Sequence, residues 1–171
     1  AVVAVNEARK IAMADRVVAA CGGSVAGKTV AVLGLSFKPN TDDLRETPAL
    51  PLIGALEAAG ATVRAYDPAA MEQARPLLPA VVFAADAYAC ATGADALVIV
   101  TEWEAFRALD LARLKQQMHS PVLVDLRNIY RSDDVVKHGF FYTSIGRADR
   151  VGPGHERGAA ENLAMAVVRP G

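Results

Sequence analysis

The sequence predicts an α/β domain of three layers, with a Rossmann-like, doubly wound parallel sheet of about six strands preceded by the end of a long helix. Strand-like and helix-like segments alternate along the chain, which is typical of this class. The predicted strands are apolar throughout, as in residues 29–35 (TVAVLGL), and such runs favour strands covered on both faces. The chain has 171 residues, of which 53% are hydrophobic, enough for the core of one ordinary domain.

The first predicted element is a helix over residues 2–20. Apolar side chains at positions 5, 8, 11, 12 and 18 follow the helical period, and Cys21-Gly22-Gly23 ends it. The chain begins with Ala1 rather than methionine, already inside this pattern. We therefore expect that preceding residues have been removed and that the helix is the remainder of a longer one.

Most of the later helices are expected to begin at a capping residue. Thr47 is a predicted N-cap with Pro48 at the first helical position, and Asp110 and Ser132 are further predicted N-caps. A short helix is expected over residues 86–92. Further strands are predicted over residues 62–66, 81–83, 96–100, 122–125 and 140–145. The last residues, from Gly146, are rich in glycine and arginine and predict a loosely attached tail.

Composition narrows the range of functions. The 18 basic and 19 acidic residues give a net charge of -1, which argues against a general DNA- or RNA-binding protein. The two cysteines and three histidines lie far apart, so we expect reduced thiols and no metal site. The N-terminus lacks the pattern of a signal peptide, and no apolar run approaches the roughly 20 residues of a membrane span. We therefore predict a cytoplasmic protein that binds neither nucleic acid nor membrane.

The long loop after the first predicted strand is one candidate binding site. A dinucleotide-binding sheet carries Gly-x-Gly-x-x-Gly here, but only Gly34 is present. Lys38 and Arg45 suit phosphate or carboxylate, and Phe37 offers a flat surface for a ring. The alternative is a solvated loop in which these cations pair with its own acidic residues, Asp42, Asp43 and Glu46.

A second candidate follows the fifth predicted strand. Asp125 and Arg127 leave this buried segment at the edge where parallel sheets bind ligands. The alternative is a structural salt bridge between them. Cys21 and Cys90 are interpreted as small core residues rather than nucleophiles, since neither lies in a context that lowers a thiol pKa. Trp103, near Phe106 at helical spacing, is expected to pack a short helix against the sheet.

Residues 30–48 (VAVLGLSFKPNTDDLRETP) closely resemble the start of the C-terminal domain in the UDP-glucose 6-dehydrogenase family. Later segments agree in their order: Ala65–Pro68, Ala96–Trp103, Val124–Asn128 and Tyr142–Arg147. The resemblance runs from about residue 2 to residue 147. GDP-mannose and UDP-N-acetylmannosamine dehydrogenases share the architecture, and the sequence Lys-Pro-Asn-Thr-Asp-Asp favours the UDP-glucose branch.

The resemblance implies an NAD-dependent oxidoreductase in the full-length protein. Members of the family oxidise UDP-glucose to UDP-glucuronate with two NAD, through a thiol-linked intermediate. Their N-terminal domain binds NAD, a long central helix joins the halves and forms a homodimer, and the C-terminal domain holds UDP. Residues 1–22 are accordingly predicted to be the end of the central helix, residues 28–147 the UDP-sugar-binding domain, and residues 148–171 a flexible tail.

The same resemblance assigns five binding residues. Phe37 and Lys38 are expected to contact the sugar nucleotide, and Arg127 matches an arginine of the substrate site, whose rigid fork holds oxygen atoms. Arg45 matches the arginine that reaches NAD. Lys10 falls where the family often places a basic residue that reaches the substrate of a neighbouring subunit, although the segment departs from the usual Gln-Lys or Gln-Arg.

No catalytic residue is predicted in this chain. The family's catalytic cysteine lies in a glycine-rich segment before the central helix, which nothing here matches, and its partner lysine and aspartate are also missing. We expect the chain to be inactive alone. A stand-alone nucleotide-binding or regulatory module is an alternative. A receiver-type signalling domain is another, but residues 34–36 lack the acidic pair that it needs after the first strand.

Overall fold

One twisted sheet organises the part of the chain that the computed structural model describes, which is residues 2–153, with side chains from residue 8 onward. Its seven strands lie in the order β3-β2-β1-β4-β5-β6-β7. They are β1 (Thr29–Leu33), β2 (Thr62–Tyr66), β3 (Val82–Phe83), β4 (Ala96–Ile99), β5 (Val122–Asp125), β6 (Phe141–Ser144) and β7 (Arg150–Val151). The first six are parallel, and β7 runs antiparallel to β6.

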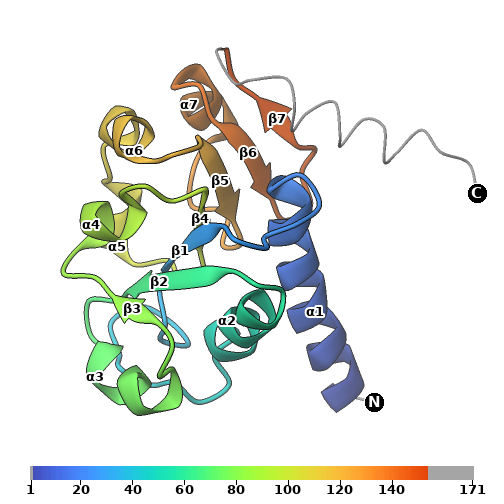
Figure 1. Cartoon of the computed structure of the whole chain (residues 1–171), viewed down its shortest axis with the longest axis vertical. Coiled ribbons are helices and arrows are strands. Elements are labelled where there is room, and N and C mark those ends of the chain that lie inside the picture. Colours follow the sequence, from blue (N-terminus) through green and yellow to red (C-terminus); the bar gives the residue numbers. More distant parts are fainter. Residues whose placement is uncertain (1, 154–171) are drawn as a thin grey trace, which may run out of the picture.

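Helices cover both faces of this sheet, as Figure 1 shows. One face carries α1 (Val2–Ala20) and α2 (Ala49–Ala58). The other carries α4 (Ala87–Ala91), α5 (Glu104–Arg107), α6 (Leu111–Gln117) and α7 (Ser132–Lys137). A short helix α3 (Met71–Ala74) and the 3-10 turn η1 (Arg75–Leu77) connect β2 to β3. None of the helices in residues 2–153 combines the length and apolar character that crossing a membrane requires.

Alternation along the strands divides the core into two layers. In β1, Val30 and Val32 pack on the side of α1 and α2, whereas Ala31 and Leu33 pack on the opposite side. Successive side chains point to opposite faces of the sheet, and all four are fully buried because helices cover both faces. The three-layer, doubly wound α/β architecture predicted from the apolar strands is therefore confirmed.

Two predicted caps differ from the structure. Pro48, not Thr47, occupies the N-cap of α2, while the Thr47 hydroxyl accepts a hydrogen bond from the amide of Ala49 and donates one to the carbonyl of Leu35. The hydroxyl thus fastens the preceding loop as well as the helix. Ser132 is the first residue of α7 rather than its cap, and its hydroxyl accepts from Arg147. By contrast, Asp110 caps α6 as predicted, through the amide of Arg113.

The seventh strand was not predicted. It lies in the glycine-rich region interpreted as a loosely attached tail, and it pairs Val151 with Phe141 at the edge of the sheet. The adjacent Gly152 packs so closely on α7 that a Cβ there would lie 2.2 Å from the carbonyl oxygen of Val136. Residues 148–153 are thus held against the domain, and the rest of the predicted tail lies outside the described residues.

Candidate functional site

The loops that leave β1, β4 and β5 meet at one edge of the sheet. These strands are adjacent and parallel, so their carboxyl ends lie side by side. Phe37 and Lys38 follow β1, residues 101–103 follow β4, and Arg127 follows β5. With neighbouring strands about 4.8 Å apart, the ends of β1 and β5 are separated by roughly 9–10 Å. The topology therefore brings the two sequence-predicted candidates to the same edge.

In the loop after β1, Lys38 is exposed and Arg45 forms an ion pair. Arg45 makes a bidentate contact with Asp43, with both N···O distances 3.0 Å. The hydrogen bonds from Arg45 lower the pKa of Asp43 to about 2. Lys38 is exposed, and its ammonium makes no hydrogen bond within the described part of the chain, whereas Phe37 leaves 47% of its surface exposed. Asp43 therefore pairs with Arg45 and leaves Lys38 available.

The segment after β5 separates the roles of its aspartate and its arginine. Asp125 is fully buried, and its carboxylate accepts from the amides of Arg127 and Tyr130 and from the hydroxyl of Tyr142. The guanidinium of Arg127 instead pairs through Nε with Glu102, from the segment after β4. The predicted alternative of an Asp125–Arg127 salt bridge is thus replaced by a different pair, and Arg127 stays partly exposed at the edge.

The turn at the end of β1 does not fit the pyrophosphate of a dinucleotide. In such sites the free amides after the strand bind the phosphates. Here the amides of Leu35 and Ser36 donate to one carboxylate oxygen of Asp67, at 2.7 and 3.0 Å. Gly34 is itself closed off, since a Cβ there would lie 2.5 Å from Thr101. A protein carboxylate thus fills the anion position.

Both cysteines are buried. Cys90 lies fully buried beneath the sheet and Cys21 lies at the end of α1. Burial raises the pKa of the Cys21 thiol to about 11 and that of Cys90 to about 12. A neutral, enclosed thiol is a poor nucleophile, so their interpretation as core residues is confirmed. The described residues hold no cluster of three or more His, Cys, Asp or Glu that could bind a metal.

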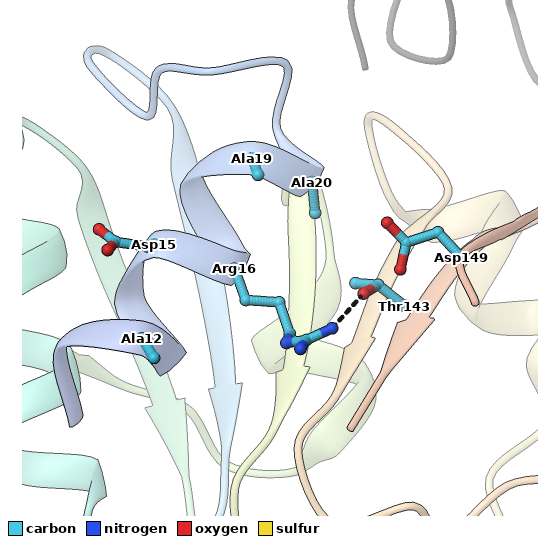
Figure 2. A pocket seen from close by; sticks show the side chains of 7 residues that line it. All are labelled: Ala12, Asp15, Arg16, Ala19, Ala20, Thr143 and Asp149. Atoms are coloured by element: carbon cyan, nitrogen blue, oxygen red, sulfur yellow. Dashed lines mark hydrogen bonds between the residues drawn. The ribbon is translucent and has the colours of Figure 1, made fainter. Parts of the chain in front are cut away.

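A pocket of about 320 Å³ lies between α1 and β6 (Figure 2). Arg16 crosses it and donates to the hydroxyl of Thr143 at 3.1 Å and to the carbonyl of Ser144 at 3.0 Å. The other lining residues are Ala12, Asp15, Ala19, Ala20 and Asp149. None of the predicted binding residues lines it. Lys10 lies on α1, the helix that also carries Arg16.

Residues 31–132 match the family model of the UDP-glucose/GDP-mannose dehydrogenase family, UDP binding domain. The chain belongs to that family. Phe37, Lys38, Arg45 and Arg127 fall inside the matched UDP-binding domain, and Lys10 falls outside it.

Known proteins agree with this assignment. The chain is 59% identical over 147 residues to UDP-glucose 6-dehydrogenase of Rhizobium meliloti (strain 1021), covering 86% of this chain and 34% of that protein. It is 39% identical to UDP-glucose 6-dehydrogenase TuaD of Bacillus subtilis (strain 168), covering 86% of this chain and 32% of that protein. The chain thus spans about a third of the length of these curated relatives.

Solved structures show the same domain. A UDP-glucose dehydrogenase from Pyrobaculum islandicum superposes with a TM-score of 0.63 at 32% identity, covering 74% of this chain and 28% of that one. NDP-N-acetyl-D-galactosaminuronic acid dehydrogenase from Methanosarcina mazei Go1 gives a TM-score of 0.69 at 29% identity, covering 82% of this chain and 29% of that one. The sheet and helices described above are therefore those of sugar-nucleotide dehydrogenases.

Sequence reasoning missed the residues that hold the UDP-binding domain's edge together. Asp67, Thr101 and Glu102 are buried or half-buried there and contact the predicted binding loops, and the half-buried Trp103 bonds to Asp67. The sequence places Asp67 only within the family-like segment Ala65–Pro68 and assigns it no role. One signal could have found it: an aspartate followed by proline, directly after an apolar strand, at the ligand edge of a parallel sheet.

Proposed function

We propose that this chain is the UDP-binding domain of a UDP-glucose 6-dehydrogenase, the enzyme that oxidises UDP-glucose to UDP-glucuronate with two NAD. The observation that carries the proposal is the exposure of Lys38 and Arg127 on loops at one edge of adjacent parallel strands. The identity to the Rhizobium meliloti UDP-glucose 6-dehydrogenase supports the choice of sugar nucleotide.

Each predicted residue has a role consistent with its surroundings. The ammonium of Lys38, which has no partner of its own among the described residues, suits a phosphate oxygen or a sugar hydroxyl. Phe37, half exposed beside it, offers its ring to the apolar face of the nucleotide. Arg127 keeps its terminal nitrogens for ligand oxygens, because its Nε pairs with Glu102.

The remaining partners follow from the family. NAD supplies the hydride acceptor in the complete enzyme and is held mainly by a separate NAD-binding domain, with Arg45 reaching it from this chain. Residues 1–22 belong to a central helix through which the enzyme forms a homodimer, and Lys10 on that helix reaches the substrate of the neighbouring subunit. Two reduced, buried thiols support a cytoplasmic location. These thiols are also unsuited to catalysis, so the chain alone is expected to be inactive.

Calorimetric titration of the chain with UDP tests the proposal. We expect saturable binding that weakens about tenfold or more in Lys38→Ala and in Arg127→Ala, because each removes a charged hydrogen bond to the ligand. Lys137→Ala is the matched control, since Lys137 lies on α7 in a surface pair with Asp134. Equal affinity in all four proteins contradicts the proposed site.

Competition experiments separate this function from its neighbours in the family. UDP-glucose and UDP should displace each other, while GDP-mannose should compete far less well. Tighter binding of GDP-mannose, or of UDP-N-acetylmannosamine over UDP-glucose, would assign the domain to a related sugar-nucleotide dehydrogenase. Binding of NAD by this chain alone would contradict the division of the two ligands between domains.

A further inference from the structure

Asp67 is a buried anion that the proposed binding residues do not explain. It directly follows β2, is fully buried, and places one carboxylate oxygen against the first loop: the amides of Leu35 and Ser36 donate to it, and the Ser36 hydroxyl lies 3.2 Å away. Trp103, from the segment after β4, donates its indole N–H to the same oxygen at 3.2 Å. One atom therefore joins the ends of three strands.

The second carboxylate oxygen is equally occupied. It accepts from the amides of Ala69 and Ala70, at 2.8 and 2.9 Å, which fixes the turn that follows β2. Burying a charge costs several kcal/mol unless hydrogen bonds replace water. Asp67 has such bonds on both oxygens, yet no lysine or arginine of the described residues bonds to it. Its charge is held by backbone and side-chain dipoles, as the charge of a bound anion would be.

Three consecutive residues after β4 each contact a different neighbour. The hydroxyl of Thr101 donates to the carbonyl of Ser36 at 2.7 Å. Glu102 pairs with Arg127, and the indole of Trp103 bonds to Asp67. Because β4 lies between β1 and β5 in the sheet, this segment sits between the loops that carry Lys38 and Arg127.

We propose that Asp67 and the segment Thr101–Trp103 form a brace that fixes the loop of Lys38 and the side chain of Arg127 in their relative positions before any ligand arrives. The residues of the brace are positioning residues: they hold the groups that bind and do not themselves contact the ligand. A site ordered in advance loses less conformational freedom on binding, which raises affinity. The significance of the brace for affinity rests on the proposed function; its existence does not.

Hydrogen exchange measured by NMR tests the brace without a ligand. Trp103 is the only tryptophan, so its indole N–H gives a single resonance. We expect slow exchange of this proton and of the Leu35 and Ser36 amides, and exchange at least about tenfold faster in Asp67→Asn, whose amide group turns a donor toward donors. Trp103→Phe, which keeps an aromatic ring, is the milder variant. It should speed the Ser36 amide even if Asp67→Asn fails to fold.

A double-mutant cycle with UDP tests the part of the brace that contacts Arg127, which is Glu102. Glu102→Gln should weaken UDP binding several-fold in the wild-type background and in Lys38→Ala, but have no further effect in Arg127→Ala, because Glu102 acts only through Arg127. Glu104→Gln is the matched control, since Glu104 is exposed and pairs with Arg107 instead. Unfolding midpoints measured in urea show whether a loss of affinity is merely a loss of fold.

The outcomes are distinct for the two proposals. Fast exchange of the Trp103 indole in the wild type, or an equal effect of Glu102→Gln with and without Arg127, overturns the brace. A chain that binds no UDP contradicts the proposed function, while the exchange rates still decide whether the brace exists.

Discussion

Of the three glycines in a Gly-x-Gly-x-x-Gly turn, this chain has only Gly34. Here Gly34 allows the segments after β1 and β4 to approach each other closely. Its φ of +101° lies in the left-handed region that side chains disfavour. A Cβ would also lie 2.5 Å from the backbone nitrogen and side chain of Thr101, the first residue of the proposed brace. Glycine is therefore required for packing as well as for backbone conformation.

Gly34→Ala should destabilise the domain by about 2–4 kcal/mol, the combined cost of strain and overpacking. Gly22→Ala is the control: its φ is +88°, but nothing lies within 4 Å of the added Cβ. It should cost only about 1–2 kcal/mol. Urea unfolding followed by circular dichroism measures both. Equal losses would show that contact with Thr101 contributes nothing.

At the scale of elements, Arg16, near the C-terminal end of α1, connects this helix to the sheet. The two hydrogen bonds to Thr143 and Ser144 connect the helix to β6, across more than 100 residues of sequence. Arg16→Met, which preserves the length of the side chain, should cost about 1–2 kcal/mol. Hydrogen exchange of the α1 amides should quicken at the same time.

Arg9→Met provides the comparison on the same helix. Arg9 is exposed, so its replacement should change the free energy of unfolding by no more than ~0.5 kcal/mol. If both variants behave alike, the contacts of Arg16 in Figure 2 do not hold the helix in place.

The last strand depends on a close approach to α7. Gly152→Ala should push β7 from α7 and cost about 1–3 kcal/mol, because the new Cβ overlaps the carbonyl of Val136. Exchange of the Gly152 amide, which donates to the carbonyl of Phe140, reports the displacement. Gly54→Ala serves as a control of opposite sign: Gly54 lies in α2 with open space beside it, so alanine should stabilise by about 0.5–1 kcal/mol.

Elements with a strong pattern could be predicted from the sequence. The inner strands β1, β4 and β5 are apolar on both faces, and that pattern is typical of a covered parallel sheet. β7 could not be predicted, because two residues carry no periodicity and their place depends on Gly152 meeting α7. The N-cap of α2 lies one residue later than predicted, at Pro48. The Thr47 hydroxyl also donates to the carbonyl of Leu35, 12 residues earlier, and the sequence does not reveal this contact.

In the candidate site too, some residues could be predicted from the sequence and others could not. Lys38, Arg45 and Arg127 could be singled out because a charge beside a buried strand is visible in the sequence. Their partners could not, since Glu102 meets Arg127 across 25 residues and Asp67 meets Ser36 across 31. Such contacts follow from strand order, which the sequence alone indicates only in outline.

For the whole molecule, we predict a loss of stability at alkaline pH. The folded-state pKa values of Cys21 and Cys90, about 11 and 12, lie above the ordinary value of 9.0, since burial favours the neutral thiol. Their contribution is therefore complete below pH 9 and is lost as the pH rises toward the folded values, by up to about 1.4 kcal/mol per thiol per pH unit. Burial raises the pKa of Tyr130 and Tyr142 in the same direction.

Urea midpoints at pH 8 and pH 10.5 measure this effect. The midpoint should fall at the higher pH, and it should fall less in Cys90→Ala, which no longer contains one of the buried thiols. A midpoint independent of pH over this interval would mean that the thiols ionise as easily in the folded chain as in the unfolded one.

The sheet begins and ends in strands of only two residues, β3 and β7. A fibril that grows by pairing the edge strands of successive protein chains needs a long row of unpaired backbone amides and carbonyls as its template. Neither margin of this sheet offers such a row within the described residues. The two short edge strands therefore give fibre growth by strand addition little template in the described part of the sheet.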